Sequence, residues 1–144
     1  MRADNYPLTR HGEWSKIWGT DNHPGRCKKM RQEVIVKTFS HIPTLETERM
    51  LLRRLSVSDA EDMFSYASLE ITSRYLTWSP HPDVYYTYNY LRRIEEQYRR
   101  GAFFDWAVVD RMDGHMIGTA GFTSFRAASD VGEIGYVLHP DYWG

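Results

Sequence analysis

The sequence predicts a single α/β domain of the α+β kind, in which a mostly antiparallel mixed sheet is backed by two helices. Three observations support this fold class. The chain has 144 residues, which is the size of one domain. Its apolar patterns run in the order strand, helix, helix and then three strands, without an internal repeat. The last three strands follow one another through short connections, which is typical of antiparallel pairing.

The first strand and the first helix are expected close together. Residues 49–55 (RMLLRRL) are predicted to form a strand. Ser58 and Glu61 then have the spacing of a capping box, in which Ser58 accepts from the Glu61 amide and Glu61 reaches back. The helix should end near Glu70, and its apolar residues have helical spacing: Ala60, Met63, Phe64 and Ala67.

The second helix follows a loop at residues 77–82, which contains two prolines. Leu91, Ile94, Glu95 and Tyr98 would lie on one side of this helix. Basic residues in its last turn suit the negative end of the helix dipole, and Gly101 supplies a left-handed C-terminal cap.

Three strands complete the pattern. Residues 103–110 are aromatic and β-branched, residues 111–114 form a hairpin turn, and residues 115–122 return with several small side chains. After a polar loop around residues 127–130, residues 132–138 form another strand that Pro140 ends.

Composition and charge divide the chain in two. The sequence is 42% hydrophobic and 15% aromatic, so it forms a core. Residues 1–44 carry a net charge of +4 and residues 45–144 a net charge of −5. We therefore expect a disordered extension over residues 1–42, a domain over residues 43–144 and no nucleic-acid partner, because no domain-wide basic surface exists to neutralise phosphates.

The lengths of the apolar runs and the single cysteine bear on the location and the metal content of the protein. No apolar run is long enough for export or membrane insertion, so we expect a cytoplasmic protein with no membrane partner. The single cysteine, Cys27, excludes an internal disulfide and suits a reducing compartment. Together with His23 it would give only two ligands, too few for a closed metal site, so no metal is expected.

Six sequence blocks lie in order between residues 43 and 144, and several of them are short. The blocks are LETERMLLRRL at 45–55, DA at 59–60, RYLTW at 74–78, WAVV at 106–109, IG at 117–118 and EIGYVLHPDYWG at 133–144. Together, and in this order, they resemble the RimJ/RimL branch of the GCN5-related N-acetyltransferases.

The resemblance implies a partial fold of this family that binds acetyl-CoA, with no metal, and acetylates a primary amine on a protein N-terminus or a small molecule. Its fourth core strand, here residues 132–138, would splay from a fifth strand. The pantetheine arm would then pair with main-chain groups of Val137, Leu138 and His139, because a departing strand leaves such groups exposed. Gly144 would be the first glycine of the turn that binds the pyrophosphate.

Glu133 is the candidate catalytic residue that the resemblance implies, since many relatives have a carboxylate there facing the acceptor. A positioned base removes the proton that an amine must lose before it attacks the thioester. Glu133 could instead bind the cation of the acceptor or cap the strand. His139 and His115 are weaker candidates for the catalytic base, because both rings are expected at the surface.

Aromatic residues between the two helices leave the acceptor open. They could line an acceptor pocket, although aromatic side chains near helices more often pack in the core or a lid. They are Tyr75, Trp78, Tyr85, Tyr86, Tyr88 and Tyr90.

Two alternatives to a working enzyme remain at this point. By the length of the family, the pyrophosphate turn, its helix and the fifth strand would follow Gly144, so the chain could be an inert truncated fragment or pseudoenzyme. It would then bind acetyl-CoA no more tightly than about millimolar. The bare sheet edge could instead recruit a protein partner, or a second copy of the chain, by strand addition.

Overall fold

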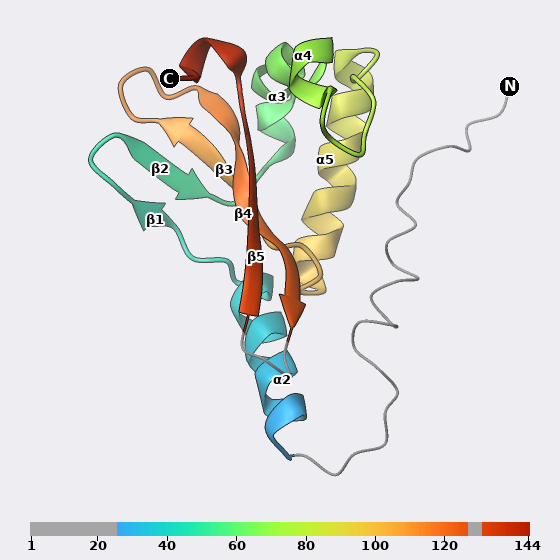
Figure 1. Ribbon diagram of the computed structural model, residues 1–144, viewed down its shortest axis with the longest axis vertical. Coiled ribbons are helices and arrows are strands. Elements are labelled where there is room, and N and C mark those ends of the chain that lie inside the picture. The colour runs from blue at the N-terminus through green and yellow to red at the C-terminus, as the bar shows by residue number, and fades with distance from the viewer. Residues whose placement is uncertain (1–25, 127–130) are drawn as a thin grey trace, which may run out of the picture.

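A five-stranded antiparallel sheet in the order β1-β2-β3-β4-β5 organises the domain. The computed structural model describes residues 26–126 and 131–144, with side chains from residue 33 onward (Figure 1). The strands are β1 (Leu45–Glu46), β2 (Met50–Arg53), β3 (Asp105–Asp110), β4 (Met116–Arg126) and β5 (Val131–Leu138). The helices are α2 (Arg26–Ser40), α3 (Ala60–Ala67), α4 (Glu70–Ser73) and α5 (Val84–Arg99), with 3₁₀ turns η1 (Val57–Asp59) and η2 (Pro140–Tyr142).

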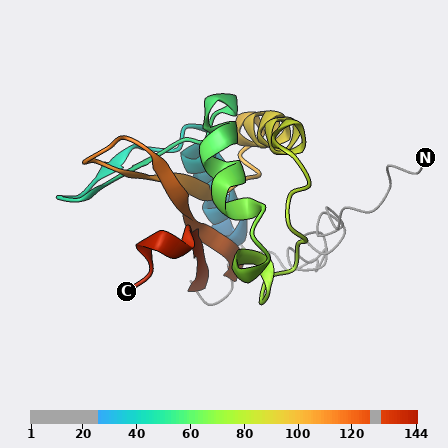
Figure 2. The ribbon, with the colours of Figure 1, turned by 90° about the horizontal axis from the view of Figure 1, so that it is seen from above.

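Helices α3 and α5 cover one face of the sheet, which we call the helix side (Figure 2). Their inward residues recur at helical spacing, as in Leu91, Ile94 and Tyr98 of α5, all at most 2% exposed. They pack against Ala107 and Val109 of β3. The predicted fold class is confirmed, and the two predicted helices correspond to α3 and α5.

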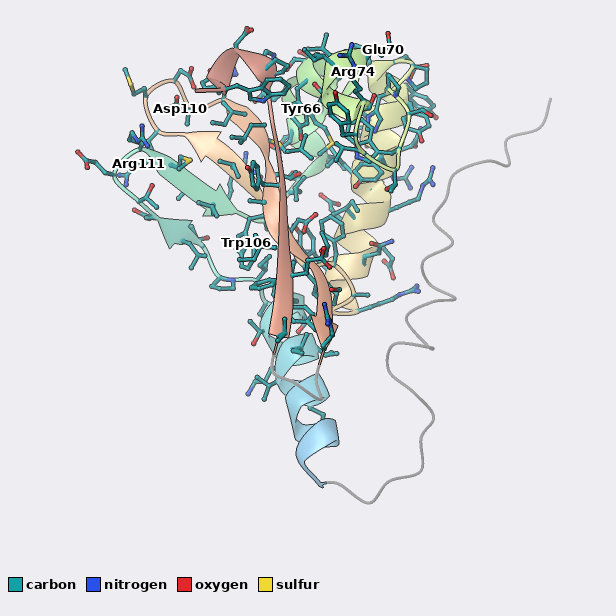
Figure 3. The ribbon with its side chains drawn as sticks, viewed as in Figure 1. Tyr66, Glu70, Arg74, Trp106, Asp110 and Arg111 are labelled. Atoms are coloured by element: carbon teal, nitrogen blue, oxygen red, sulfur yellow. The ribbon has the colours of Figure 1, made fainter. Side chains whose placement is uncertain are left out.

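The opposite face of the sheet carries an aromatic cluster around Phe39 of α2. The Phe39 ring lies 4.9 Å from Phe104, 5.5 Å from Trp106 and 6.0 Å from Phe122, measured between ring centroids. Phe39 itself is 4% exposed. Figure 3 shows Trp106 on this side of β5 and Tyr66 toward the helices.

The expectation of disorder over residues 1–42 is wrong for residues 26–40, which form α2. The helix lacks a sustained apolar period, and its last turn is held by tertiary contacts of Phe39, which local sequence does not show. Residues 1–25 lie outside the described residues. The domain boundary at residue 43 stays a prediction.

The capping box before α3 lies two residues earlier than predicted. Ser56, not Ser58, is the capping residue, and its partner in the capping box is Asp59. A 3₁₀ turn precedes the α-helix and shifts the cap toward the N-terminus. Asp59 is 3% exposed, and it accepts two hydrogen bonds from the Arg53 guanidinium, at 2.9 and 2.6 Å. This pair raises the pKa of Arg53 and ties β2 to the start of α3.

The other boundaries follow the predicted pattern closely. Gly101 has φ +61 and ends α5, as expected. Strand β4 runs to Arg126, four residues beyond the predicted end, because a bulge between Phe122 and Ser124 lets it continue beside β5. The predicted loop at 127–130 lies outside the described residues. No helix in the described ranges is long and apolar enough to cross a membrane.

Candidate acetyl-transfer site

Strand β5 is the last strand of the sheet, and within the described residues it pairs only with β4. The His139 N–H donates to the Ile117 carbonyl at 2.7 Å, and Thr119 pairs with Val137. Main-chain hydrogen-bonding groups alternate in direction along a strand. The N–H and C=O groups of Val137 and His139 therefore point toward β4, whereas those of Leu138 point toward the edge that no described strand covers. The three predicted residues therefore lie at the end of β5, and the main-chain N–H and C=O of Leu138 are directed away from β4.

The end of β5 is fixed by the turn η2. The Trp143 indole N–H donates to the Leu138 carbonyl at 2.9 Å. The His139 ring does not point into solvent as expected, because its Nδ1 accepts from the Asp141 N–H at 3.1 Å and caps the turn. Gly144 follows with φ +109, a conformation that favours glycine.

Glu133 lies near the start of β5, and its side chain is exposed. Its Oε2 accepts a hydrogen bond from the Ser124 hydroxyl at 3.0 Å, across the bulge of β4. Side chains alternate along a strand, and Val137 packs against the helix-side core, so Glu133 also belongs to the helix side. A carboxylate thus lies on the sheet face that α3 and α5 cover.

Sequence reasoning missed Asp105 and Tyr66. Burial raises the pKa of the Asp105 carboxyl to about 6. Tyr66 is 2% exposed, and no group in the described part of the chain lies in hydrogen-bond geometry with its hydroxyl. The sequence could have indicated Asp105, because it is the one charged residue in the otherwise apolar segment at 103–109. Tyr66 gave no signal beyond helical spacing.

The remaining candidates lie elsewhere. His115 is exposed as predicted, and its Nδ1 lies 3.0 Å from Asp62 Oδ1, a contact that raises the pKa of His115. Trp78 and Tyr90 pack against the core, whereas Tyr75 and Tyr85 are 90% and 72% exposed and fill neither core nor lid. Within the described side chains no group of three metal-ligating residues forms.

The fold of this chain is similar to that of proteins with solved structures. The fold is similar to the crystal structure of a GNAT-family acetyltransferase from Bacillus anthracis, with a TM-score of 0.58 and 20% identity over 69% of this chain and 55% of that one. It is also similar to a ribosomal-protein-S5-alanine acetyltransferase from Vibrio fischeri, with a TM-score of 0.52 and 24% identity over 71% of this chain and 58% of that one. The chain therefore shares its fold with both structures over the matched part.

The chain belongs to the acetyltransferase (GNAT) domain family, whose model matches residues 49–144. A curated relative, the uncharacterized N-acetyltransferase p20 of Bacillus licheniformis, is 29% identical over 101 residues, which cover 70% of this chain. The matched part is 57% of that relative, so the chain spans little more than half of its length.

Proposed function

We propose that this protein transfers an acetyl group from acetyl-CoA to a primary amine. The neutral amine nitrogen attacks the carbonyl carbon of the thioester, an N–C bond forms and the C–S bond breaks. The proton lost by the amine is balanced by the proton gained by sulfur, so coenzyme A leaves as the thiol and the product is an amide. The single cysteine suits a reducing compartment, and we place the reaction in the cytoplasm.

The observation that carries the proposal is the edge of β5 that no strand of the described residues covers. At Leu138 the N–H is directed away from β4, where an amide-bearing arm such as pantetheine can pair with it as an added strand would. The Leu138 carbonyl already accepts from Trp143, so the N–H is the group that the edge offers there. Gly144, in the turn that follows, would begin the binding of the pyrophosphate.

Glu133 is the group we assign to proton removal. Its carboxylate is exposed, and the Ser124 hydroxyl holds it at 3.0 Å on the helix side of the sheet. An amine with an ordinary pKa near 8 needs little help at pH 7, whereas a lysine-like amine near 10.4 must lose its proton at a cost of about 4.6 kcal/mol. A positioned carboxylate, acting directly or through water, contributes about 10²- to 10⁴-fold to such a step.

The acceptor belongs to the finer part of the proposal. The six blocks that resemble the RimJ/RimL branch suggest a protein N-terminus as the acceptor, and the name of the Vibrio fischeri ribosomal-protein-S5-alanine acetyltransferase is consistent with a protein acceptor. A small amine is the alternative. The rates of acetyl transfer to a peptide N-terminus and to a small free amine distinguish the two.

The test is acetyl-CoA binding by calorimetry, followed by release of the coenzyme A thiol with a peptide N-terminus and with small amines. Saturable binding and amine-dependent thiol release are expected. Binding weaker than about millimolar, together with no thiol release, would overturn the proposal and favour the inert alternative.

A further inference from the structure

The turn η2 separates the two main-chain positions that the proposed site uses for acetyl-CoA. Leu138 lies before the turn and Gly144 lies after it. The position of the turn therefore sets the spacing between the N–H that would pair with the pantetheine arm and the place where binding of the pyrophosphate would begin. Binding groups must be held to within about 0.5 Å to act together, so a displaced turn would weaken acetyl-CoA binding.

Most hydrogen bonds of this turn are made within the same short segment. The Tyr142 N–H donates to the His139 carbonyl at 3.0 Å, and the Asp141 N–H donates to His139 Nδ1 at 3.1 Å. The Trp143 indole N–H donates back to the Leu138 carbonyl. These bonds give the turn its shape, but each of them joins it only to the end of β5.

One hydrogen bond joins the turn to a different part of the domain. The Tyr142 hydroxyl donates to Asp113 Oδ2 at 3.3 Å. Asp113 lies in the hairpin between β3 and β4, which Figure 1 shows beside the C-terminal turn. Among the described residues, no other hydrogen bond or ion pair links residues 140–144 to a residue outside 138–144. Asp113 is therefore the one polar group of the described chain that fixes the turn from outside.

The Tyr142 hydroxyl keeps the proton that this bond needs. Desolvation, followed by the negative charge of Asp113, raises the pKa of Tyr142 above its ordinary value of 10.0. The phenol is therefore protonated at neutral pH and donates to the carboxylate. A hydrogen bond to a charged acceptor is stronger than one between two neutral groups.

Asp113 is itself anchored on two sides. Its Oδ1 accepts from the His115 N–H at 2.9 Å, within the hairpin. The following residues contact α3, because His115 Nδ1 lies 3.0 Å from Asp62 Oδ1 and the Met116 N–H donates to Asp62 Oδ2 at 2.8 Å. The carboxylate that holds η2 is thus fixed both to the sheet and to α3, and it gives the turn a fixed support.

We infer that Asp113 is a positioning residue of the acetyl-CoA site, which holds η2 in place through the Tyr142 hydroxyl. The inference rests on the proposed function and adds a residue to it. Asp113 acts on acetyl-CoA through the turn and does not touch the reacting atoms. It should therefore affect binding of the donor, whereas the amine acceptor and the chemical step do not depend on it.

The experiment measures the steady-state kinetics of thiol release for Tyr142→Phe, Asp113→Ala and the double variant. Tyr142→Phe removes the donor of the bond and keeps the ring. Asp113→Ala removes the acceptor, together with the bond to His115. Tyr136→Phe is the matched control, because Tyr136 is a 73% exposed residue of β5 whose hydroxyl takes part in no hydrogen bond among the described residues. Thermal unfolding checks that each variant is folded.

Tyr142→Phe should raise the KM for acetyl-CoA about three- to tenfold, as expected for the loss of one hydrogen bond, while kcat and the KM for the amine stay within about twofold. Tyr136→Phe should change none of these. In the Asp113→Ala background, Tyr142→Phe should have no further effect, because its partner is already absent. An unchanged KM for acetyl-CoA in Tyr142→Phe, or an equal effect of Tyr142→Phe in both backgrounds, would overturn the inference.

A second measurement needs no acetyl-CoA. Asp113→Ala should shift the NMR signals of the Trp143 indole and the Gly144 amide, and unchanged signals would overturn the inference. If the wild-type protein neither binds acetyl-CoA nor releases thiol, the proposed transfer fails, and these signals still decide whether Asp113 positions the turn. If thiol is released but neither the signals nor the KM for acetyl-CoA respond to Asp113→Ala, only the positioning role fails.

Discussion

The Trp143 indole N–H donates to the Leu138 carbonyl at 2.9 Å, across the turn that ends β5. This bond satisfies one main-chain group of an edge strand and leaves the Leu138 N–H as the group directed outward. The side chain of Trp143 is 52% exposed, so the bond lies at the rim of the site. At Leu138 the edge therefore offers a main-chain donor, which suits an arm that presents a carbonyl group there.

Leu138→Pro tests whether this N–H binds the donor. Proline removes the N–H but leaves the ladder with β4 intact, because that N–H faces away from it. Acetyl-CoA affinity should fall at least about tenfold, as expected for the loss of one hydrogen bond and some local fit. Ile134→Pro is the control, since it removes an outward N–H from the same strand, and calorimetry should show a smaller loss. Equal losses would mean that the effect is only structural.

Glu133→Gln tests the proposed base. We expect kcat to fall about 10²- to 10⁴-fold while acetyl-CoA affinity changes little, because the amide keeps the shape but cannot take a proton. Ser124→Ala is the control, since it removes the hydrogen bond to the Glu133 carboxylate but keeps the charge. Steady-state thiol release measures both. An unchanged kcat in Glu133→Gln would remove this residue from the mechanism.

Asp105→Asn should stabilise the protein at neutral pH. Burial raises the pKa of Asp105 from 3.8 to about 6, so its contribution to stability is full below about pH 3.8 and is lost as the pH rises through about 6. The neutral variant should therefore be more stable at pH 7 by roughly 1–3 kcal/mol. The difference should shrink as the pH falls toward 4, and urea unfolding at several pH values measures it. A destabilised variant at pH 7 would contradict this account.

His81 should make the protein sensitive to acid. It is 7% exposed, its Nδ1 lies 2.8 Å from the Thr87 hydroxyl, and burial lowers its pKa from 6.5 to about 4. The contribution of neutral His81 to the stability of the folded protein is complete above about pH 6.5 and is lost as the pH falls through about 4. We expect a loss of roughly 1–3 kcal/mol over this range. An NMR titration of the ring should give a midpoint well below 6.5, and His81→Gln should flatten the loss.

Gly118→Ala should weaken the β4–β5 pairing that presents the edge. A Cβ at Gly118 would lie 2.1 Å from the Val137 carbonyl oxygen, a main-chain atom that cannot move aside. We expect a loss of stability of about 2 kcal/mol or more. Gly132→Ala is the control, because its nearest contact, at 2.9 Å, is the Phe122 ring, a side chain. Thermal unfolding of the two variants should differ clearly, and equal melting temperatures would contradict the prediction.

Most of the elements could be predicted because their signals are local. The apolar period of Leu91, Ile94 and Tyr98 gave α5, and Gly101 gave its end. The strand at 132–138 and its end at Pro140 were equally plain from residue type. The family resemblance, confirmed for residues 49–144, then supplied Glu133 and the positions 137–139 as candidates. Their roles stay predictions.

Tertiary structure alone decided the rest. The sequence determined α3, α5 and the strands β2 to β5, since each depends on neighbouring residues and on the spacing of apolar side chains. It did not determine that Phe39 anchors α2, because that packing joins residues more than 60 positions apart. Nor did it show that Asp105, Gly121 and Gly135 form one row toward Glu133, since strand register is set by pairing across the sheet rather than along the chain.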